Sequence, residues 1–171
     1  MIGRLLAASV ISLGVIGCAP RTVAVTVPFD AKQAAYIHTK GKATIRGQAF
    51  LRRNDGIVVY AAGSDVSLTP ATAYAEERMA GIFQGRKYLS GLAQLSFENE
   101  DPEYRSFKRI AKANGEGRFT FPEVASGPYF VVTTVGWCAP SQYGCLQQGG
   151  ALMNRITISG TEKAELILDG K

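Results

Sequence analysis

Polar and apolar residues alternate along much of the chain with the two-residue period of half-buried strands. Ile45 and Ala49 fall on one face of the first such segment, and Thr44 falls on the other. Strands are predicted over residues 43–52, 57–60, 66–69, 107–112, 118–121, 152–159 and 163–169. Residues 129–137 have apolar residues at both odd and even positions, which favours a central strand with both faces covered. The pattern therefore predicts seven or so strands at short spacing.

The beginning of the chain and the middle of the chain interrupt this pattern in different ways. Near the beginning, alternating valines at residues 23–27 allow a short strand. Asp30 follows and can cap a brief helix over residues 31–38, because its carboxylate can accept a hydrogen bond from the first turn. Gly41 is the expected end of that segment.

The middle of the chain contains the longest connection between predicted strands. Thr69 or Thr72 can cap a short helix over residues 74–79. Residues 81–101 show no regular period. We therefore expect residues 71–106 to form one short helix or an irregular excursion off the sheets. Long connections that a scaffold does not require often carry binding sites.

Turn signals separate the later strands. Asn114 and Gly115 stand between two strand candidates, and Asn-Gly is a strong hairpin signal because both residues tolerate positive φ. Phe119 and Phe121 should then face the core together. Since no strand is followed by a long helix, Rossmann and TIM-barrel folds are excluded. The predicted class is an all-β antiparallel β-sandwich, with a small closed barrel as the alternative.

The N-terminal segment has the features of an export signal. A basic start containing Arg4 precedes an apolar run over residues 5–16, which is shorter than the roughly 20 residues that a membrane-spanning helix needs. Val15-Ile16-Gly17-Cys18 follows and resembles the lipobox of bacterial lipoproteins. The alternative is an ordinary secretory signal in which the cysteine is fortuitous.

The lipobox resemblance implies that residues 1–17 are removed and that Cys18 carries the acyl chains. Ala19 follows in place of the aspartate that favours inner-membrane retention, so we expect an outer-membrane anchor with the domain facing the periplasm. The expected organisation is a signal peptide over 1–17, a lipidated tether and lead-in over 18–40, and one domain over 41–171. The membrane is then a partner through Cys18.

Composition adds limits on the chemistry. The chain has 171 residues with 19 Lys+Arg and 14 Asp+Glu, and removing the signal leaves a formal charge of +4. The basic residues are dispersed, so we expect no nucleic-acid partner. A single histidine, His38, and three cysteines offer little material for a metal centre or a histidine-based active site. We expect no cofactor and no catalytic residue.

Two cysteines remain after the lipid site. Cys138 and Cys145 form an even pair in an exported chain, and oxidising compartments favour a disulfide between them. The intervening residues contain Pro and Gly, so a short loop closed at its base is expected. A metal pair or a redox dithiol is the alternative, although further ligands and the usual two-residue spacer are missing.

Residues 41–168 resemble the carboxypeptidase regulatory-like domain, which has a transthyretin-like fold. The resemblance rests on residues 43–50, on 63–70 and above all on 113–131, where a polar turn precedes Gly-Arg-Phe-Thr-Phe and a loop ends in Gly-Pro-Tyr. It implies a seven-stranded sandwich and a non-catalytic module. The chain departs from the family at Asn114 and Glu116, where aspartate is frequent, and it lacks the histidines of the hydrolytic transthyretin-like relatives.

Four aromatic residues are the candidates for recognition: Trp137, Tyr143, Phe83 and Tyr88. Trp137 and Tyr143 flank or lie in the cysteine loop, and the other two lie in the excursion. The alternative for Trp137 is packing on the disulfide. We expect a non-catalytic lipid-anchored envelope protein that recognises a protein or a polysaccharide. The alternatives are a structural subunit of a secretion or pilus assembly, pairing through an edge strand at 23–27, and an enzyme of unrecognised type.

Overall fold

The computed structural model describes residues 20–142 and 144–171. Within them the chain is mostly β-structure, with short helical segments near the N-terminus and in the middle. The elements are β1 (Arg21–Ala24), α1 (Ala31–Ala34), η1 (Ala35–His38), β2 (Ala43–Arg52), β3 (Val58–Tyr60), β4 (Asp65–Pro70), α2 (Ala73–Phe83), β5 (Tyr88–Ser90), β6 (Leu95–Glu98), η2 (Glu103–Ser106), β7 (Arg109–Lys112), β8 (Arg118–Val124), β9 (Gly127–Ser141), β10 (Gly144–Ile158) and β11 (Lys163–Leu168). No helix in the described part is long and apolar enough to cross a membrane.

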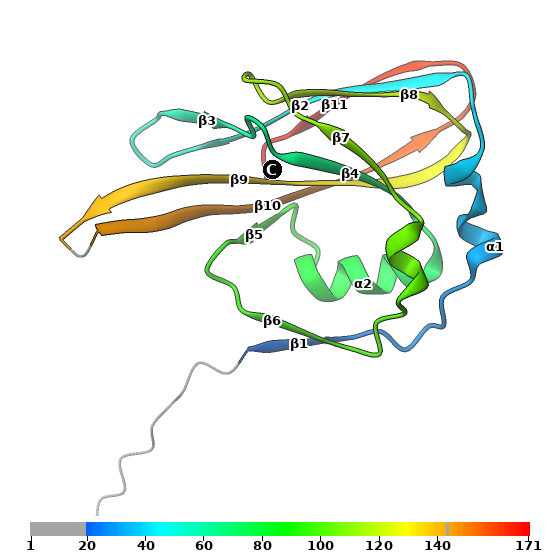
Figure 1. The fold of residues 1–171 in the computed structure, drawn as a ribbon, viewed down its shortest axis with the longest axis horizontal. Helices are drawn as coiled ribbons and strands as arrows, with labels where there is room; N and C mark the ends of the chain where they lie inside the picture. Colours follow the sequence, from blue (N-terminus) through cyan, green and yellow to red (C-terminus); the bar gives the residue numbers. More distant parts are fainter. Residues whose placement is uncertain (1–19, 143) are drawn as a thin grey trace, which may run out of the picture.

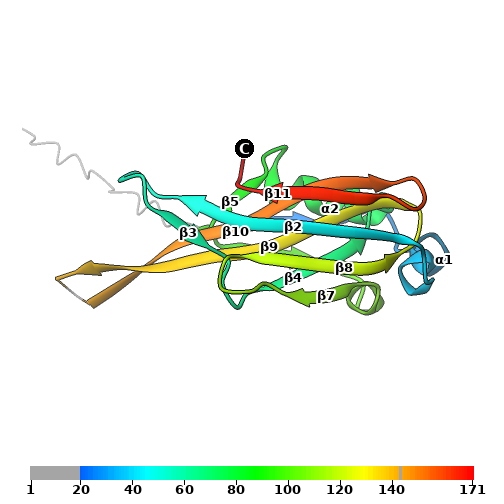
Figure 2. The same ribbon diagram turned by 90° about the horizontal axis from the view of Figure 1, so that it is seen from above.

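Two sheets face each other, as the sequence predicts for a β-sandwich. One sheet has five strands in the order β5-β10-β9-β4-β7, and its pairs are antiparallel. In the other sheet β2 pairs with β11, β3 and β8, and only the β11–β2 pair is parallel. Figure 1 shows the two sheets as separate layers, and Figure 2 shows β11, β2 and β8 side by side from above. The predicted all-β sandwich is confirmed.

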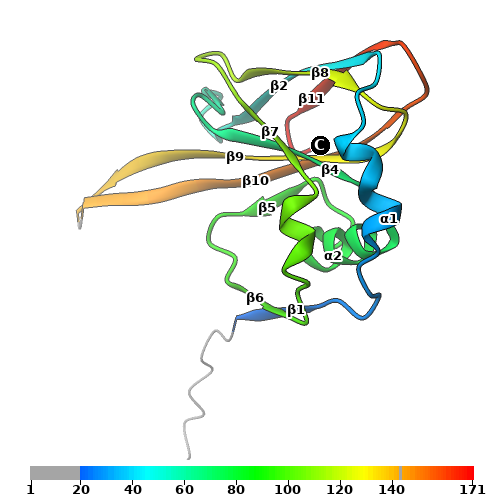
Figure 3. The same cartoon turned by 45° about the vertical axis from the view of Figure 1, so that its right-hand side comes forward.

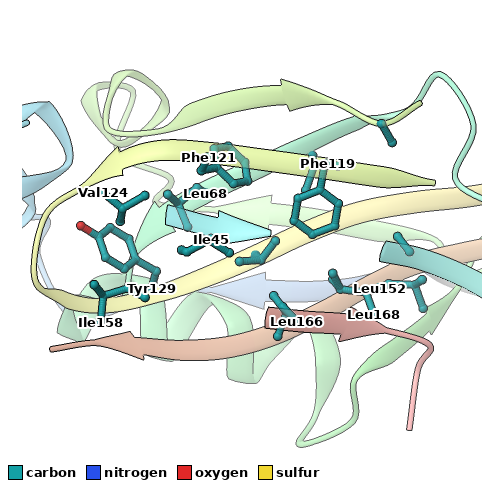
Figure 4. Close-up of a cluster of buried hydrophobic side chains, with 14 of the residues drawn as sticks. Ile45, Leu68, Phe119, Phe121, Val124, Tyr129, Leu152, Ile158, Leu166 and Leu168 are labelled. Atoms are coloured by element: carbon teal, nitrogen blue, oxygen red, sulfur yellow. The ribbon is translucent and has the colours of Figure 1, made fainter. Parts of the chain in front are cut away.

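The main core fills the space between the sheets. Ile45, Leu68 and Phe121 are at most 2% exposed, and Figure 4 shows them in one cluster. Phe119 and Phe121 both point inward from β8, as the alternation predicts, and their rings meet edge to face. Tyr129 is 1% exposed at the start of β9, and its hydroxyl donates to the Ala125 carbonyl at 2.9 Å. The β8–β9 connection is thereby tied to the core.

A third layer covers the outer face of the five-stranded sheet. It consists of α2, η2, β1 and β6, seen below the sheet in Figures 1 and 3. A second apolar cluster lies at this interface and includes Met79, Ile82 and Phe130. Both faces of β9 are covered, which explains why its odd and even positions are both apolar. Val131 faces the main core, whereas Phe130 faces the third layer.

Most of the predicted excursion is regular structure rather than an irregular loop. The helix begins where expected, because the Thr72 hydroxyl accepts a hydrogen bond from the Ala75 amide. It runs on to Phe83 and ends at Gln84, which adopts the left-handed conformation. Strands β5 and β6 follow, and β5 joins the edge of the five-stranded sheet. Neither strand is predicted by the sequence, because residues 81–101 show no regular two-residue period.

The expected lead-in is folded onto the domain from Arg21 onward. Strand β1 pairs in parallel with β6, and Val23 is 2% exposed against the third layer. The Arg21 guanidinium donates to the carbonyls of Gly81 and Ile82, at the C-terminal end of α2 where a cation is favourable. Asp30 caps the helix predicted over 31–38, its carboxylate accepting from the Lys32 amide at 2.9 Å.

The predicted hairpin at Asn114 and Gly115 is wrong. Strand β7 pairs with β4 in one sheet, whereas β8 pairs with β2 in the other, so the turn carries the chain across the sandwich. The Asn114 side-chain oxygen accepts from the amides of Glu116 and Arg118, and the positive φ falls on Gly117 at 72°. The local turn chemistry is therefore present, but it joins two sheets rather than two neighbouring strands.

The predicted disulfide is confirmed. Cys138 and Cys145 are bonded, with their Cα atoms 5.4 Å apart. The expected strand over 152–159 starts earlier, because β10 pairs with β9 from Gly144 onward and the two form one long hairpin. The disulfide therefore crosses the end of this hairpin instead of closing the base of a free loop. Figure 1 shows the hairpin projecting beyond the rest of the sandwich.

Candidate functional site

The structure brings two of the predicted recognition residues together and separates a third. Trp137 and Tyr88 line the same hollow, which lies where β5 meets the long hairpin. Phe83 is only 3% exposed and lies in the third layer, so its ring is not the surface aromatic that the sequence suggested. Cys18 and Tyr143 lie outside the described residues.

The hollow beside Trp137 has a volume of about 290 Å³, and we call it the Trp137 hollow. Apolar rings and planar polar side chains share its wall. It is lined by Leu51, Arg52, Arg53, Asn54, Tyr88, Ser90, Leu92, Trp137, Gln148 and Gly149. The side chain mixture is typical of sites that bind a partly polar ligand, in which apolar surface supplies area and a few polar groups fix orientation.

Strand pairing places the two aromatic residues. Tyr88 pairs with Leu152 at the sheet edge, and Trp137 pairs with Gln148 across the hairpin. The Tyr88 hydroxyl donates to the Gly149 carbonyl at 2.9 Å, and the Gly91 amide donates to the same carbonyl at 2.8 Å. The β5 edge is therefore fastened to β10 directly beside Trp137.

Other lining residues come from the end of β2 and from the turn that follows it. Arg53 forms an ion pair with Asp55 at 2.6 Å, and Arg52 donates to the Gly56 carbonyl at 3.2 Å. These contacts hold two guanidinium groups beside the Trp137 hollow. Leu92 is 67% exposed at its rim. The hollow is consequently basic, partly apolar and open to solvent.

A larger cavity lies between α2, η2 and the outer face of the five-stranded sheet. Its volume is about 480 Å³, and we call it the Arg78 cavity. Ser67, Thr69, Arg78, Met79, Ile82, Phe83, Phe97, Glu100, Tyr104, Arg105, Lys108, Val132 and Ala151 line it. Phe83, the third recognition candidate, thus lies in the wall of this cavity and is itself buried, so it is not part of an exposed aromatic patch.

A charged network forms one side of the Arg78 cavity. Glu100 accepts from both Nε and one terminal nitrogen of Arg78, at 3.1 and 2.6 Å, and from Arg105 at 2.6 Å. The side chains of Arg78 and Glu100 are only 16% and 15% exposed. The Arg78 guanidinium also lies 4.7 Å from the centre of the Phe97 ring, which is a cation–π arrangement. Arg78 is therefore held from two sides.

This network predicts an acid-sensitive contribution to folding. Burial acts to raise the pKa of Glu100, but hydrogen bonds from Arg105 and Arg78 outweigh it and leave the pKa below its ordinary value. Because the folded-state pKa is lowered, the contribution is complete above the unfolded pKa of about 4.3 and is lost as pH falls through the folded value. We expect the stability difference between the wild type and Glu100→Gln, measured by urea unfolding, to shrink below that pH.

The exposed glutamate Glu165 provides the control for this experiment. It has no ion pair among the described residues, so Glu165→Gln should keep a small, nearly constant difference across the same pH series. A Glu100→Gln difference that stays flat from neutral pH to pH 3 would contradict the expected linkage.

Sequence reasoning missed the Arg78 cavity. The acidic run at residues 98–103 reads as a solvated turn, and Arg78 follows two glutamates on a helix without a motif. Only the fold of the third layer brings Arg78 to Glu100. Among the described residues no group of three or more His, Cys, Asp or Glu side chains could hold a metal ion. His38 packs edge to face against Phe107, with ring centres 5.0 Å apart.

No family model matches the chain, and no curated protein matches it. Among solved structures, the chain is similar to a protein from Pseudomonas aeruginosa described as a "putative carbohydrate binding protein". The two share 23% sequence identity, the match covers 82% of this chain and 97% of that chain, and the TM-score is 0.69. Likeness at this level of identity shows a shared fold.

Proposed function

We propose that this protein is a non-catalytic, lipid-anchored component of the bacterial cell envelope that binds a glycan in the Trp137 hollow. The observation that carries the proposal is the meeting of Trp137 and Tyr88 with guanidinium and amide side chains in one open hollow. Sugars present C–H faces that pack on aromatic rings and hydroxyl groups that exchange hydrogen bonds with planar polar side chains.

The polar residues of the hollow are suited to this chemistry. Arg52 and Arg53 supply several N–H donors, while Asn54 and Gln148 can donate and accept. Ligands bound at such surfaces need pre-oriented partners, because ordering a flexible side chain costs free energy. The contacts of Arg53 with Asp55 and of Tyr88 with Gly149 provide that order. The fold shared with the protein described as a "putative carbohydrate binding protein" supports the same proposal.

The proposed anchor gives the domain a defined position at the membrane. Only Ala19 and Pro20 separate Cys18 from Arg21, the first residue of β1. Three residue steps span at most about 11 Å, so an acylated Cys18 would hold the domain against the bilayer surface. Metabolic labelling with palmitate tests this part: label is expected on the wild type, and label retained by Cys18→Ala would contradict it.

Glycan binding can be tested with the single tryptophan of the chain, which is Trp137. The soluble domain from residue 19 onward would first be screened on an array of neutral and acidic oligosaccharides. The strongest array ligand would then be titrated while tryptophan emission is recorded, and a saturable change is expected. By calorimetry, Trp137→Ala should weaken binding by at least about tenfold, equivalent to ~1.4 kcal/mol.

Two further variants make the result specific. Asn54→Ala removes an exposed polar side chain of the hollow, and weaker binding is expected without loss of folding. Tyr60→Ala removes an exposed aromatic residue on β3 that does not line the hollow, and unchanged binding is expected. The proposal fails if the array shows no binding, or if Trp137→Ala and Tyr60→Ala bind alike.

A further inference from the structure

The Arg78 cavity shares no lining residue with the Trp137 hollow. Its volume of about 480 Å³ falls within the range of about 300–1,000 Å³ that small-molecule sites occupy. One wall is apolar, with Met79 and Ile82 from α2 and Val132 from the sheet. The other wall carries the charged groups of the Glu100 network. Such a site is built for a ligand with two chemically different parts.

The charges of the cavity favour an anion. Arg78, Arg105 and Lys108 line it together with one carboxylate, that of Glu100, so the formal charge of the lining is +2. Glu100 engages Nε and one terminal nitrogen of Arg78, and no described residue accepts a hydrogen bond from the other terminal nitrogen. Lys108 has no ion pair within the described part of the chain. One terminal nitrogen of Arg78 and the ammonium group of Lys108 can therefore donate to a ligand, although Arg78 is already paired with Glu100.

The Tyr104 hydroxyl supplies an independent observation. Tyr104 is 7% exposed, and its hydroxyl is a buried polar atom without a hydrogen-bond partner among the described residues. Burial raises the pKa of Tyr104 to about 12, so the hydroxyl stays protonated and remains a donor near neutral pH. A buried donor without an acceptor is unfavourable. The residue lies beside Arg78, whose guanidinium is 5.4 Å from the centre of its ring.

From these contacts we infer that the Arg78 cavity binds an acidic amphiphile, which is a molecule with one carboxylate and an apolar body. The carboxylate would lie among Arg78, Tyr104 and Lys108, where charge-assisted hydrogen bonds are strongest. The apolar body would pack against Met79 and Ile82. Because the Tyr104 hydroxyl is itself buried, it would reach the carboxylate only if the η2 segment that carries it moved.

Octanoate is the probe that tests this inference, and octanamide is its neutral counterpart. Calorimetric titration should show saturable binding of octanoate to the soluble domain and at least about tenfold weaker binding of octanamide. Labelling of the methionine methyl groups locates the ligand: the NMR signal of Met79 should shift, whereas that of Met153, which does not line the cavity, should move much less. Equal affinity for the two probes would overturn the inference.

Variants separate binding from folding. Tyr104→Phe removes the unpartnered hydroxyl and should lower octanoate affinity about five- to tenfold while the midpoint of thermal unfolding stays equal or rises. Lys108→Ala should also weaken binding, Lys108→Arg should restore it, and Lys112→Ala, an exposed lysine paired with Asp65, should have no effect. Full octanoate affinity in both Tyr104→Phe and Lys108→Ala would refute the assignment.

A last comparison separates a soluble acid from a lipid surface. Phosphatidylglycerol vesicles offer anionic headgroups, and phosphatidylcholine vesicles provide the neutral reference. Octanoate binding with the Met79 shift supports the cavity as the site, whether or not vesicles also bind. Binding to phosphatidylglycerol vesicles without any octanoate-induced shift at Met79 would mean surface attraction alone and would overturn the inference.

Discussion

Gly149→Ala is expected to destabilise the protein by more than about 3 kcal/mol, because the position requires glycine for two separate reasons. Its φ is +102°, a backbone conformation that residues with a side chain rarely adopt. A Cβ atom added there would lie 2.0 Å from the Val135 carbonyl oxygen and 2.9 Å from the Gly136 Cα atom. Both neighbours are backbone of the paired strand β9, so neither can move aside without breaking the hairpin. Urea unfolding measures the change.

Gly144→Ala is the matched control for this variant. Gly144 lies in the same hairpin with φ +104°, but a Cβ atom there meets nothing within 4 Å. It should cost only the backbone strain, on the order of 1–2 kcal/mol. Equal losses for the two variants would mean that the clash with Val135 is relieved. Because the Gly149 carbonyl also accepts from Tyr88 and Gly91, we expect Gly149→Ala to reduce glycan binding at the Trp137 hollow as well.

The sandwich itself could be predicted from the sequence because burial on one face imposes a two-residue period. Residues 43–52 show this most clearly, since β2 has Ala43, Ile45 and Ala49 fully buried on its inner face. The helix caps at Asp30 and Thr72 were equally readable, because each depends on a side chain and an amide within three residues of it. Local chemistry was therefore a sound guide to local structure.

The order of strands in the sheets could not be predicted in this way. The turn at Asn114 has all the chemistry of a hairpin turn, but its flanking strands pair with β4 and β2 in opposite sheets. Which strand lies beside another is decided by packing of distant faces, which no short segment encodes. The same limit applies to the third layer, where β1, near the start of the chain, pairs with β6, late in the excursion.

The candidate sites could be predicted only in part for the same reason. Trp137 and Tyr88 were singled out separately as aromatic residues in unusual segments, and the pairing of β5 with β10 brings them to one hollow. Nothing in the sequence marks Arg78 and Tyr104 as binding residues, because a charged residue on a helix and a tyrosine in a loop commonly lie on the surface. Their burial depends on the third layer closing over the sheet.

Tyr129→Ala is expected to lower the free energy of unfolding by about 3–5 kcal/mol, as for large aromatic side chains removed from a core. Tyr129 is 1% exposed and packs edge to face with Tyr36, with ring centres 5.1 Å apart. Its hydroxyl bond to Ala125 closes the connection between β8 and β9. The truncation would therefore leave a cavity between the sheets and release the connection at once. Urea unfolding at neutral pH, with the m-value compared, measures the effect.

Tyr129→Phe divides this loss into its two parts. The variant keeps the ring and its contact with Tyr36 but leaves the Ala125 carbonyl without its donor, so a loss of about 1 kcal/mol is expected. If ring packing dominates, Tyr129→Phe should lose much less free energy of unfolding than Tyr129→Ala. Equal losses for the two variants would instead mean that the hydroxyl bond to Ala125 supplies most of the stabilisation. The β8–β9 connection, and not burial of the ring, would then stabilise this end of the main core.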